Sequence, residues 1–220
     1  DFHKTGFAPY LSSVYITKDK TEIFEQNHYK GISYDELEYG NYSPFQYTLE
    51  LSRPLNGPLA AYVNLKTFGV TGFQKIIGNL MDASEHLKEL LNNTGRFEVI
   101  NDNDSDGFVT LFVAKETKNS PSFFELNNLS PAKIEQFGQY SFYLFLLEKQ
   151  KKGECWFAID YSTGYHRLSD GKKLGVLKAY PMTPYFDKKA AEKLVKDIMI
   201  FQQKFDKVKD TFVVKEVPHK

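Results

Sequence analysis

Hydrophobic side chains recur at every third or fourth position over 73–91, a spacing that predicts an amphipathic helix ended by Gly95. A shorter helix is expected over 59–68 and would end at Gly69. The same spacing returns over 187–205, where Lys and Asp residues occupy the opposite face. Each helix therefore has one apolar side that must pack against another part of the chain.

Shorter runs that are rich in β-branched and aromatic residues predict strands. These runs cover 11–17, 97–100, 108–113, 156–161 and 174–180. Asn, Asp and Gly separate the second run from the third, and two glycines lie between the fourth and the fifth. The last four strands are therefore expected as two strands joined by a turn-rich linker and two strands that flank a loop.

The region 24–58 is rich in Tyr, Asn, Gly, Ser and Pro, so we expect a long segment there that is either functional or mobile. Ser130 and Pro131 form a good helix start, because a capping hydroxyl precedes a proline at the first helical position. The order after the long helix is then β-β-α-β-β-α. This order predicts a sheet with helices on one face, preceded by the end of another domain, in an α/β or α+β fold.

The charges of the chain balance, because 28 Lys and Arg residues stand against 28 Asp and Glu residues. A neutral chain lacks the basic surface that attracts nucleic acid or anionic membranes, so neither is predicted as a partner. No apolar run approaches the ~20 residues of a membrane span. The single cysteine, Cys155, favours a reducing, cytoplasmic location. The histidines show no metal-ligand spacing, so no metal site is predicted.

The candidate chemistry lies at the start of the chain. His3 and Lys4 are followed by Gly6 and Pro9 and then by the first predicted strand. An amine held in a cleft becomes a nucleophile toward carbonyl groups once burial or a neighbouring cation lowers its pKa. The alternative interpretation is an ordinary solvated lysine on the surface.

Three stretches in the same order resemble a known family. The run 1–10 (DFHKTGFAPY) is similar to the Asp-Pro-His-Lys-x-Gly-Tyr-x-Pro-Tyr signature of group II pyridoxal-phosphate-dependent amino-acid decarboxylases, which include glutamate, aromatic amino-acid and tyrosine decarboxylases. The Ser-Arg element at 51–53 and the helix pair at 59–73 resemble the next part of that family. The stretch 175–184 is similar to its penultimate strand and the turn that follows.

The resemblance implies a fold-type-I transferase-like α/β fold, with the end of the large domain followed by the C-terminal α+β small domain. On this basis 1–57 is expected to belong to the large cofactor-binding domain, 58–95 to linking helices, and 96–220 to the small domain. The chain opens on Asp1 without an initiator Met, and the family's contacts to the cofactor ring and phosphate lie upstream of the lysine. We therefore expect this chain to be the C-terminal half of a homodimeric enzyme. The missing N-terminal half of the same protein is expected as a further partner.

The resemblance also assigns roles to three residues. Lys4 is expected to form the Schiff base with the aldehyde of pyridoxal 5'-phosphate, and His3 to help hold the phosphate of this cofactor. Tyr10 is expected either near the side chain of the substrate or packed at the entrance of the first strand. Tyr29 and Tyr34 lie where the family carries a mobile loop whose tyrosine donates a proton.

The predicted activity is removal of the α-carboxylate of an amino acid, which gives an amine and carbon dioxide. The isolated fragment is expected to be inactive, because the contacts to the cofactor ring are absent from it. One alternative is a non-catalytic dimerisation or interaction module. Another is a pyridoxal-phosphate lyase that acts on a different bond, because the same lysine serves both reactions.

Overall fold

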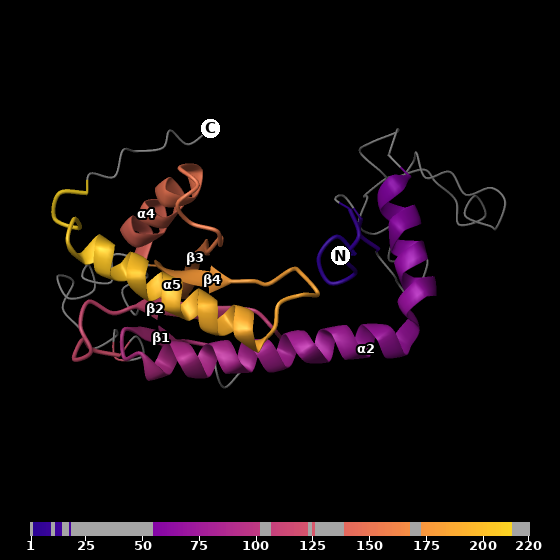
Figure 1. The fold of residues 1–220 in the computed structure, drawn as a ribbon, viewed down its shortest axis with the longest axis horizontal. Helices are drawn as coiled ribbons and strands as arrows, with labels where there is room; N and C mark the ends of the chain where they lie inside the picture. The colour runs from indigo at the N-terminus through magenta and orange to yellow at the C-terminus, as the bar shows by residue number, and fades with distance from the viewer. Residues whose placement is uncertain are drawn as a thin grey trace, which may run out of the picture. The chain divides into compact units, whose positions relative to one another are not determined.

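The computed structural model forms two compact units, Asp1–Phe73 and Gln74–Lys220 (Figure 1). The structure describes residues 2–9, 12–14, 18, 55–101, 107–122, 125, 139–167 and 173–212.

Helix α2 spans Asn56–Asn93 and is interrupted at Gly69. Gly69 has φ 58° and ψ −170°, a backbone conformation that a residue with a Cβ rarely adopts. The sequence-based expectation of two helices separated at this glycine is confirmed. The second helical segment ends at Asn93, and Gly95 follows with φ 63°.

The Gln74–Lys220 unit contains a four-stranded antiparallel sheet. Its strands are β1 (Phe97–Val99), β2 (Thr110–Ala114), β3 (Asp160–Arg167) and β4 (Lys173–Ala179), in the order β1-β2-β4-β3. In the register, Val99 lies opposite Phe112, and Phe112 lies opposite Leu177. The strands predicted over 97–100, 108–113 and 174–180 are therefore present, and β4 lies between β2 and β3.

One strand begins later than predicted. The run 156–161 was expected to be a strand, but β3 begins at Asp160 and continues to Arg167, so that Gly164 lies within the strand. Residues 154–160 do alternate between exposed and buried positions, as a strand does. Their buried members pack into the core without a partner in the sheet, and this packing accounts for the misleading pattern.

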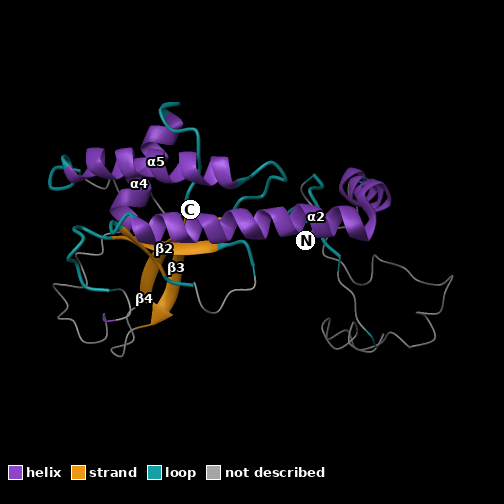
Figure 2. Cartoon of the chain, turned by 60° about the horizontal axis from the view of Figure 1, so that its bottom comes forward, coloured by secondary structure: helices purple, strands orange, loops and turns teal. Residues whose placement is uncertain are grey.

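Two helices of this unit lie with α2 on one face of the sheet (Figure 2). They are α4 (Gln139–Lys151) and α5 (Lys188–Asp206). The carboxylate of Asp187 caps α5 by accepting a hydrogen bond from the amide of Ala190 at 2.8 Å. The prediction of a last helix over 187–205 is thus confirmed. The predicted helix start at Ser130 lies outside the described residues.

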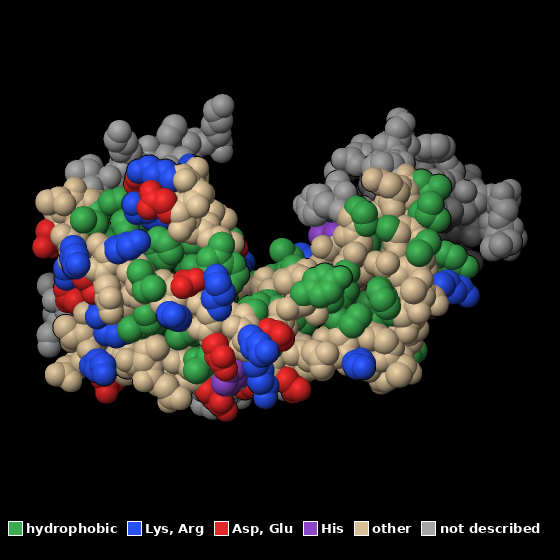
Figure 3. Space-filling view, viewed as in Figure 1, with side chains coloured by type: hydrophobic (Ala, Val, Ile, Leu, Met, Phe, Trp, Pro, Cys, Tyr) green, Lys and Arg blue, Asp and Glu red, His purple; other side chains and the backbone are tan. Residues whose placement is uncertain are grey.

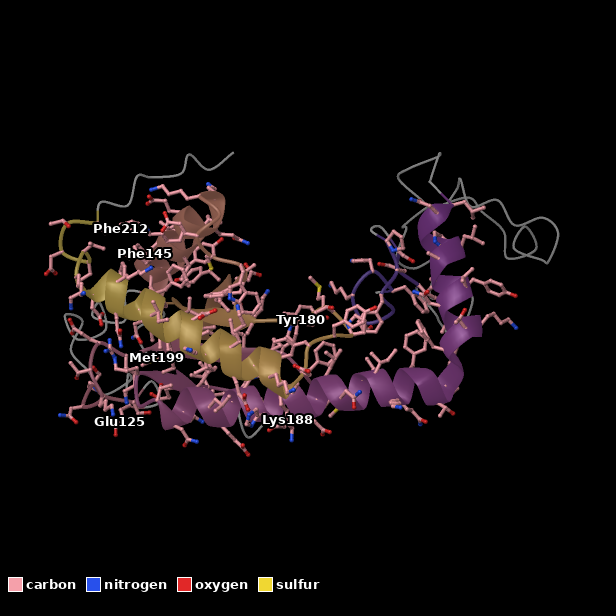
Figure 4. All side chains as sticks on the ribbon, in the orientation of Figure 1. Glu125, Phe145, Tyr180, Lys188, Met199 and Phe212 are labelled. Atoms are coloured by element: carbon pink, nitrogen blue, oxygen red, sulfur yellow. The ribbon has the colours of Figure 1, made fainter. Side chains whose placement is uncertain are left out.

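The core of this unit is built from the apolar faces of the sheet and the helices. Phe97 of β1 packs edge to face on Phe112 of β2, with ring centroids 5.6 Å apart. Phe145 and Phe212 point toward one another, 5.8 Å apart (Figure 4). The buried cluster comprises Leu87, Leu91, Phe97, Val99, Phe112, Phe142, Phe145, Leu146, Cys155, Phe157, Ile159, Leu177, Ala179, Ala191, Leu194, Val195, Ile198 and Phe201.

A glutamine side chain completes the end of β2. Only Thr110–Phe112 of this strand pairs with β4, so Ala114 lies beyond the ladder on that side. Gln139 compensates, because its Oε1 accepts from the Ala114 amide at 2.7 Å and its Nε2 donates to the Ala114 carbonyl at 2.8 Å. Both backbone groups of Ala114 are thereby satisfied, as buried groups require.

Cys155 is part of the core. Its Sγ donates to the carbonyl oxygen of Phe157 at 3.1 Å. Burial raises the pKa of the Cys155 thiol above its ordinary value. A thiol that stays protonated is a poor nucleophile, so Cys155 contributes packing rather than reactivity.

Phe112 provides a test of this core. We expect Phe112→Ala to lower the free energy of unfolding by about 3–5 kcal/mol, because it leaves a cavity among fully buried neighbours. Val70→Ala is the control, since Val70 is 76% exposed and should change the free energy by less than about 0.5 kcal/mol. Urea titration followed by circular dichroism measures both. Equal effects of the two variants would contradict the assignment of the core.

Asp160 provides a test of how the stability of this unit depends on pH. The hydrogen bond from Nζ of Lys178, at 2.6 Å, lowers the pKa of Asp160, and the amide of Tyr161 assists. A carboxyl whose pKa is lowered in the folded state stabilises the fold at pH values above its unfolded pKa of about 4. This contribution to the free energy of unfolding is lost as the pH falls through the lower pKa of the folded state. Because the pair is exposed, Asp160→Asn should cost less than about 1 kcal/mol at neutral pH. Unfolding measured at neutral pH and at about pH 2 should show the difference at neutral pH only.

Candidate functional site

Lys4 lies in a short backbone turn of the Asp1–Phe73 unit. The amide of Ala8 donates to the carbonyl oxygen of Phe2 at 2.9 Å and closes the turn around Lys4. The amide of His3 donates to the carbonyl oxygen of Ser12 at 3.1 Å. The side chains of His3 and Lys4 are half-buried. The backbone on both sides of the lysine is therefore held by hydrogen bonds.

Two residues after Lys4, at Gly6, the backbone passes close to Phe2. A Cβ on Gly6 would lie 2.9 Å from the Cα and from the carbonyl oxygen of Phe2, so only glycine fits there. The next residue, Phe7, has φ 52°, a left-handed conformation that is rare for a bulky residue. Strained backbone of this kind is concentrated at functional sites, where surrounding contacts maintain it.

The imidazole of His3 is held by the backbone of Ser12. Nδ1 lies 2.8 Å from the Ser12 carbonyl oxygen and 3.2 Å from the Ser12 amide nitrogen. Nδ1 donates to the carbonyl in one tautomer and accepts from the amide in the other. In both tautomers this contact fixes the orientation of the ring beside Lys4.

One side chain of α2 reaches the turn. Nδ2 of Asn64 donates to the carbonyl oxygen of Gly6 at 2.9 Å and to that of Phe7 at 3.2 Å. Asn64 lies one helical turn after Ala61, which is buried, so both residues are on the same side of the helix. A residue distant in the sequence thus secures the strained part of the turn.

Two of the three predicted site residues lie in the part of the chain that the structure describes. His3 and Lys4 are adjacent in the same turn, and both are described. Tyr10 lies outside the described residues, as do Tyr29 and Tyr34 and most of the region 24–58. Of the strand predicted over 11–17, the described residues 12–14 have no regular secondary structure.

Asn64 is not among the site residues predicted from the sequence. A signal was present, because asparagine is a poor helix former and here lies in the interior of a helix. Such a residue is expected to have a partner outside its own helix. The sequence contains no indication that this partner is the backbone next to Lys4.

The side chains in the turn fit one end of pyridoxal phosphate. A primary amine condenses with an aldehyde, and Lys4 places one on a backbone that is fixed on both sides. The adjacent imidazole of His3 is a suitable hydrogen-bonding group for a phosphate oxygen or the ring substituents. The donor set therefore fits covalent attachment of an aldehyde cofactor.

The described part of the Gln74–Lys220 unit contains a cavity of about 260 Å³. Asp206 on its wall pairs with Arg96 at 2.6 Å, and Lys209 pairs with Glu116. These charges neutralise one another within the wall. None of the predicted site residues lines this cavity.

No group of three or more His, Cys, Asp or Glu residues among the described residues is arranged to hold a metal ion. In the same part of the chain, no helix has both the length and the apolar character needed to cross a membrane.

The family of the chain follows from a match to a known protein domain. The pyridoxal-dependent decarboxylase conserved domain matches residues 2–113. This match covers half of the chain and includes the turn with Lys4 and the whole of α2. The chain belongs to this family. No curated protein sequence matches it.

Solved structures of group II decarboxylases share the mixed α/β fold. Mouse CSAD in the apo form superposes with a TM-score of 0.55 at 15% identity, and the match covers 84% of this chain and 34% of that one. Glutamate decarboxylase of Lactobacillus brevis gives a TM-score of 0.50 at 15% identity, with 73% and 30% covered. The chain therefore spans about a third of the length of these relatives.

The steric requirement at Gly6 is testable. We expect Gly6→Ala to lower the free energy of unfolding by about 1–3 kcal/mol, because the added methyl group displaces the backbone of Phe2. Gly78→Ala is the matched control. Gly78 lies inside α2 with no heavy atom within 4 Å of the added Cβ, so this change should stabilise the chain by about 1 kcal/mol. Denaturant titration measures both, and effects of equal sign would contradict the close approach.

Proposed function

We propose that Lys4 is the residue that carries pyridoxal phosphate, and that the chain is the C-terminal part of an amino-acid decarboxylase. The observation that supports this most directly is the turn, which fixes a half-buried lysine beside an oriented histidine. Membership of the pyridoxal-dependent decarboxylase family supports the choice of cofactor and reaction.

In this proposal, each side chain of the turn has a separate task. When bound, pyridoxal phosphate supplies an aldehyde that condenses with an amine, with loss of one water, and a ring that accepts the electrons left when carbon dioxide departs. Lys4 would provide the amine that holds this aldehyde. His3, whose orientation is set by Ser12, holds the phosphate end. The product is the amine of the substrate amino acid.

Further elements of the proposal concern the rest of the chain. We assign 1–57 to the end of the large cofactor-binding domain, 58–95 to the linking helices, and 96–220 to the small domain. Tyr10 is placed near the side chain of the substrate. The active form is a cytoplasmic homodimer. Each subunit also contains the N-terminal half of the protein, which supplies the remaining contacts to the cofactor.

A non-catalytic dimerisation module is the second candidate, and one observation favours it. The first part of α2 exposes large apolar side chains, which are Leu59, Tyr62, Val63, Leu65 and Phe68. Apolar side chains are visible over this helix in Figure 3. Exposed apolar surface of this kind is typical of a protein–protein interface.

Chemical trapping tests the role of Lys4. The intact protein is incubated with pyridoxal phosphate, reduced with borohydride, digested and mapped by mass spectrometry. We expect the label on the peptide that contains Lys4, and Lys4→Ala should remove the label and reduce decarboxylation about a hundredfold or more. Lys66→Ala is the control, because Lys66 is an exposed lysine of the same unit and should leave both unchanged.

The two candidate functions predict different results in this experiment. A label on another lysine, or normal activity of Lys4→Ala, would overturn the assignment of Lys4. Mixing the chain with the N-terminal half separates the candidates, because the enzyme hypothesis predicts that activity returns. Association of the chain without recovery of activity would favour the dimerisation module.

A further inference from the structure

The side of α2 that contacts the turn with Lys4 differs from the rest of this helical segment. Residues 62, 63 and 65–68 of α2 are all exposed, whereas Asn64 between them is half-buried. The buried side of this helical segment also carries the small residues Gly57 and Ala61. Small side chains on this side allow another backbone to approach closely enough for a short asparagine to reach it.

The chemistry of Asn64 matches what it contacts. Its amide nitrogen carries two hydrogens, and the two carbonyl oxygens of Gly6 and Phe7 lie at 2.9 Å and 3.2 Å. One hydrogen is therefore available for each oxygen. An aspartate of the same shape has no hydrogen to donate at neutral pH and would repel both oxygens. The contact therefore requires a donor, not only a side chain of this size.

The contacted groups belong to the part of the turn with the most strained conformation. Phe7 is left-handed, with φ 52°, and its own amide donates to the carbonyl oxygen of Lys4 at 3.4 Å. Release of Phe7 into an ordinary conformation would redirect the amide of Ala8, which closes the turn by donating to the Phe2 carbonyl oxygen at 2.9 Å. The conformation at Phe7 thus maintains the hydrogen bond that closes the turn around Lys4.

We infer that Asn64 is a positioning residue for Lys4: it donates to the Gly6 and Phe7 carbonyls and thereby fixes the direction in which the lysine amine is presented to an aldehyde. This inference rests on the proposed role of Lys4. Asn64 itself contacts the backbone of the turn and is not assigned any contact with substrate or cofactor.

The test compares three substitutions in the intact protein loaded with pyridoxal phosphate. Asn64→Ala removes the donor, Asn64→Asp replaces it with an acceptor of equal size, and Asn64→Gln retains it on a longer side chain. The readouts are the dissociation constant of the cofactor and the pH midpoint of its visible absorbance. We expect the Ala and Asp variants to weaken binding about tenfold, as the loss of two hydrogen bonds would, and to shift the midpoint. The Gln variant should recover part of the loss.

Asn101→Ala is the matched control. Asn101 also makes two hydrogen bonds to the backbone, one to the Val109 carbonyl and one from the Leu111 amide, both at 2.8 Å, but in the other unit. It should lower the melting temperature without changing the affinity for the cofactor or its absorbance. If it changes these as much as Asn64→Ala does, the effect is one of general stability and the inference is wrong.

The remaining outcomes distinguish this inference from the proposed function. If the Asp variant binds the cofactor as the unsubstituted protein does, packing alone accounts for Asn64 and the positioning role is overturned, while Lys4 keeps its assignment. If borohydride reduction of the unsubstituted protein labels a lysine other than Lys4, both the proposed function and the inference are overturned.

Discussion

The close approach of Gly6 to Phe2 is the constraint on which the placement of Lys4 depends. Because residue 6 has no side chain, the backbone returns closely enough for the amide of Ala8 to reach the Phe2 carbonyl oxygen. The same closure leaves Phe7 in the left-handed region, and the Phe7 carbonyl becomes one of the two acceptors of Asn64. A steric property of one residue thus leads to the hydrogen bonds that hold the site.

The Gln74–Lys220 unit is stabilised in a different way. Its sheet packs its core against helices on one face, and each helix contributes one apolar side. A polar side chain satisfies the backbone where the sheet is incomplete, as Gln139 does by bonding both backbone groups of Ala114. Burial of apolar surface determines the structure here, whereas specific hydrogen bonds determine it around Lys4.

The sequence predicted the parts of the fold that follow from local periodicity. The helices over 73–91 and 187–205 and the break at Gly69 are all observed, because spacing and backbone freedom are local properties. The start of β3 was misplaced because an alternating buried pattern does not reveal whether a neighbouring strand is present. The proximity of His3 to Lys4 is visible in the sequence. The contact of Asn64 with the turn joins residues 57 and 58 positions apart, and no local pattern encodes it.

This separation along the chain has an energetic consequence for the site. Closing a flexible loop costs entropy that grows slowly with length, by about 0.6 kcal/mol for each doubling. The hydrogen bonds from Asn64, which join residues 57 and 58 positions apart, have to offset a cost of this kind. Hydrogen bonds within its own backbone hold the turn. The helical spacing of residues in α2 keeps the small residues together on one side of the helix. The placement of Lys4 thus depends on contacts between two short, locally folded pieces, the turn and the first segment of α2.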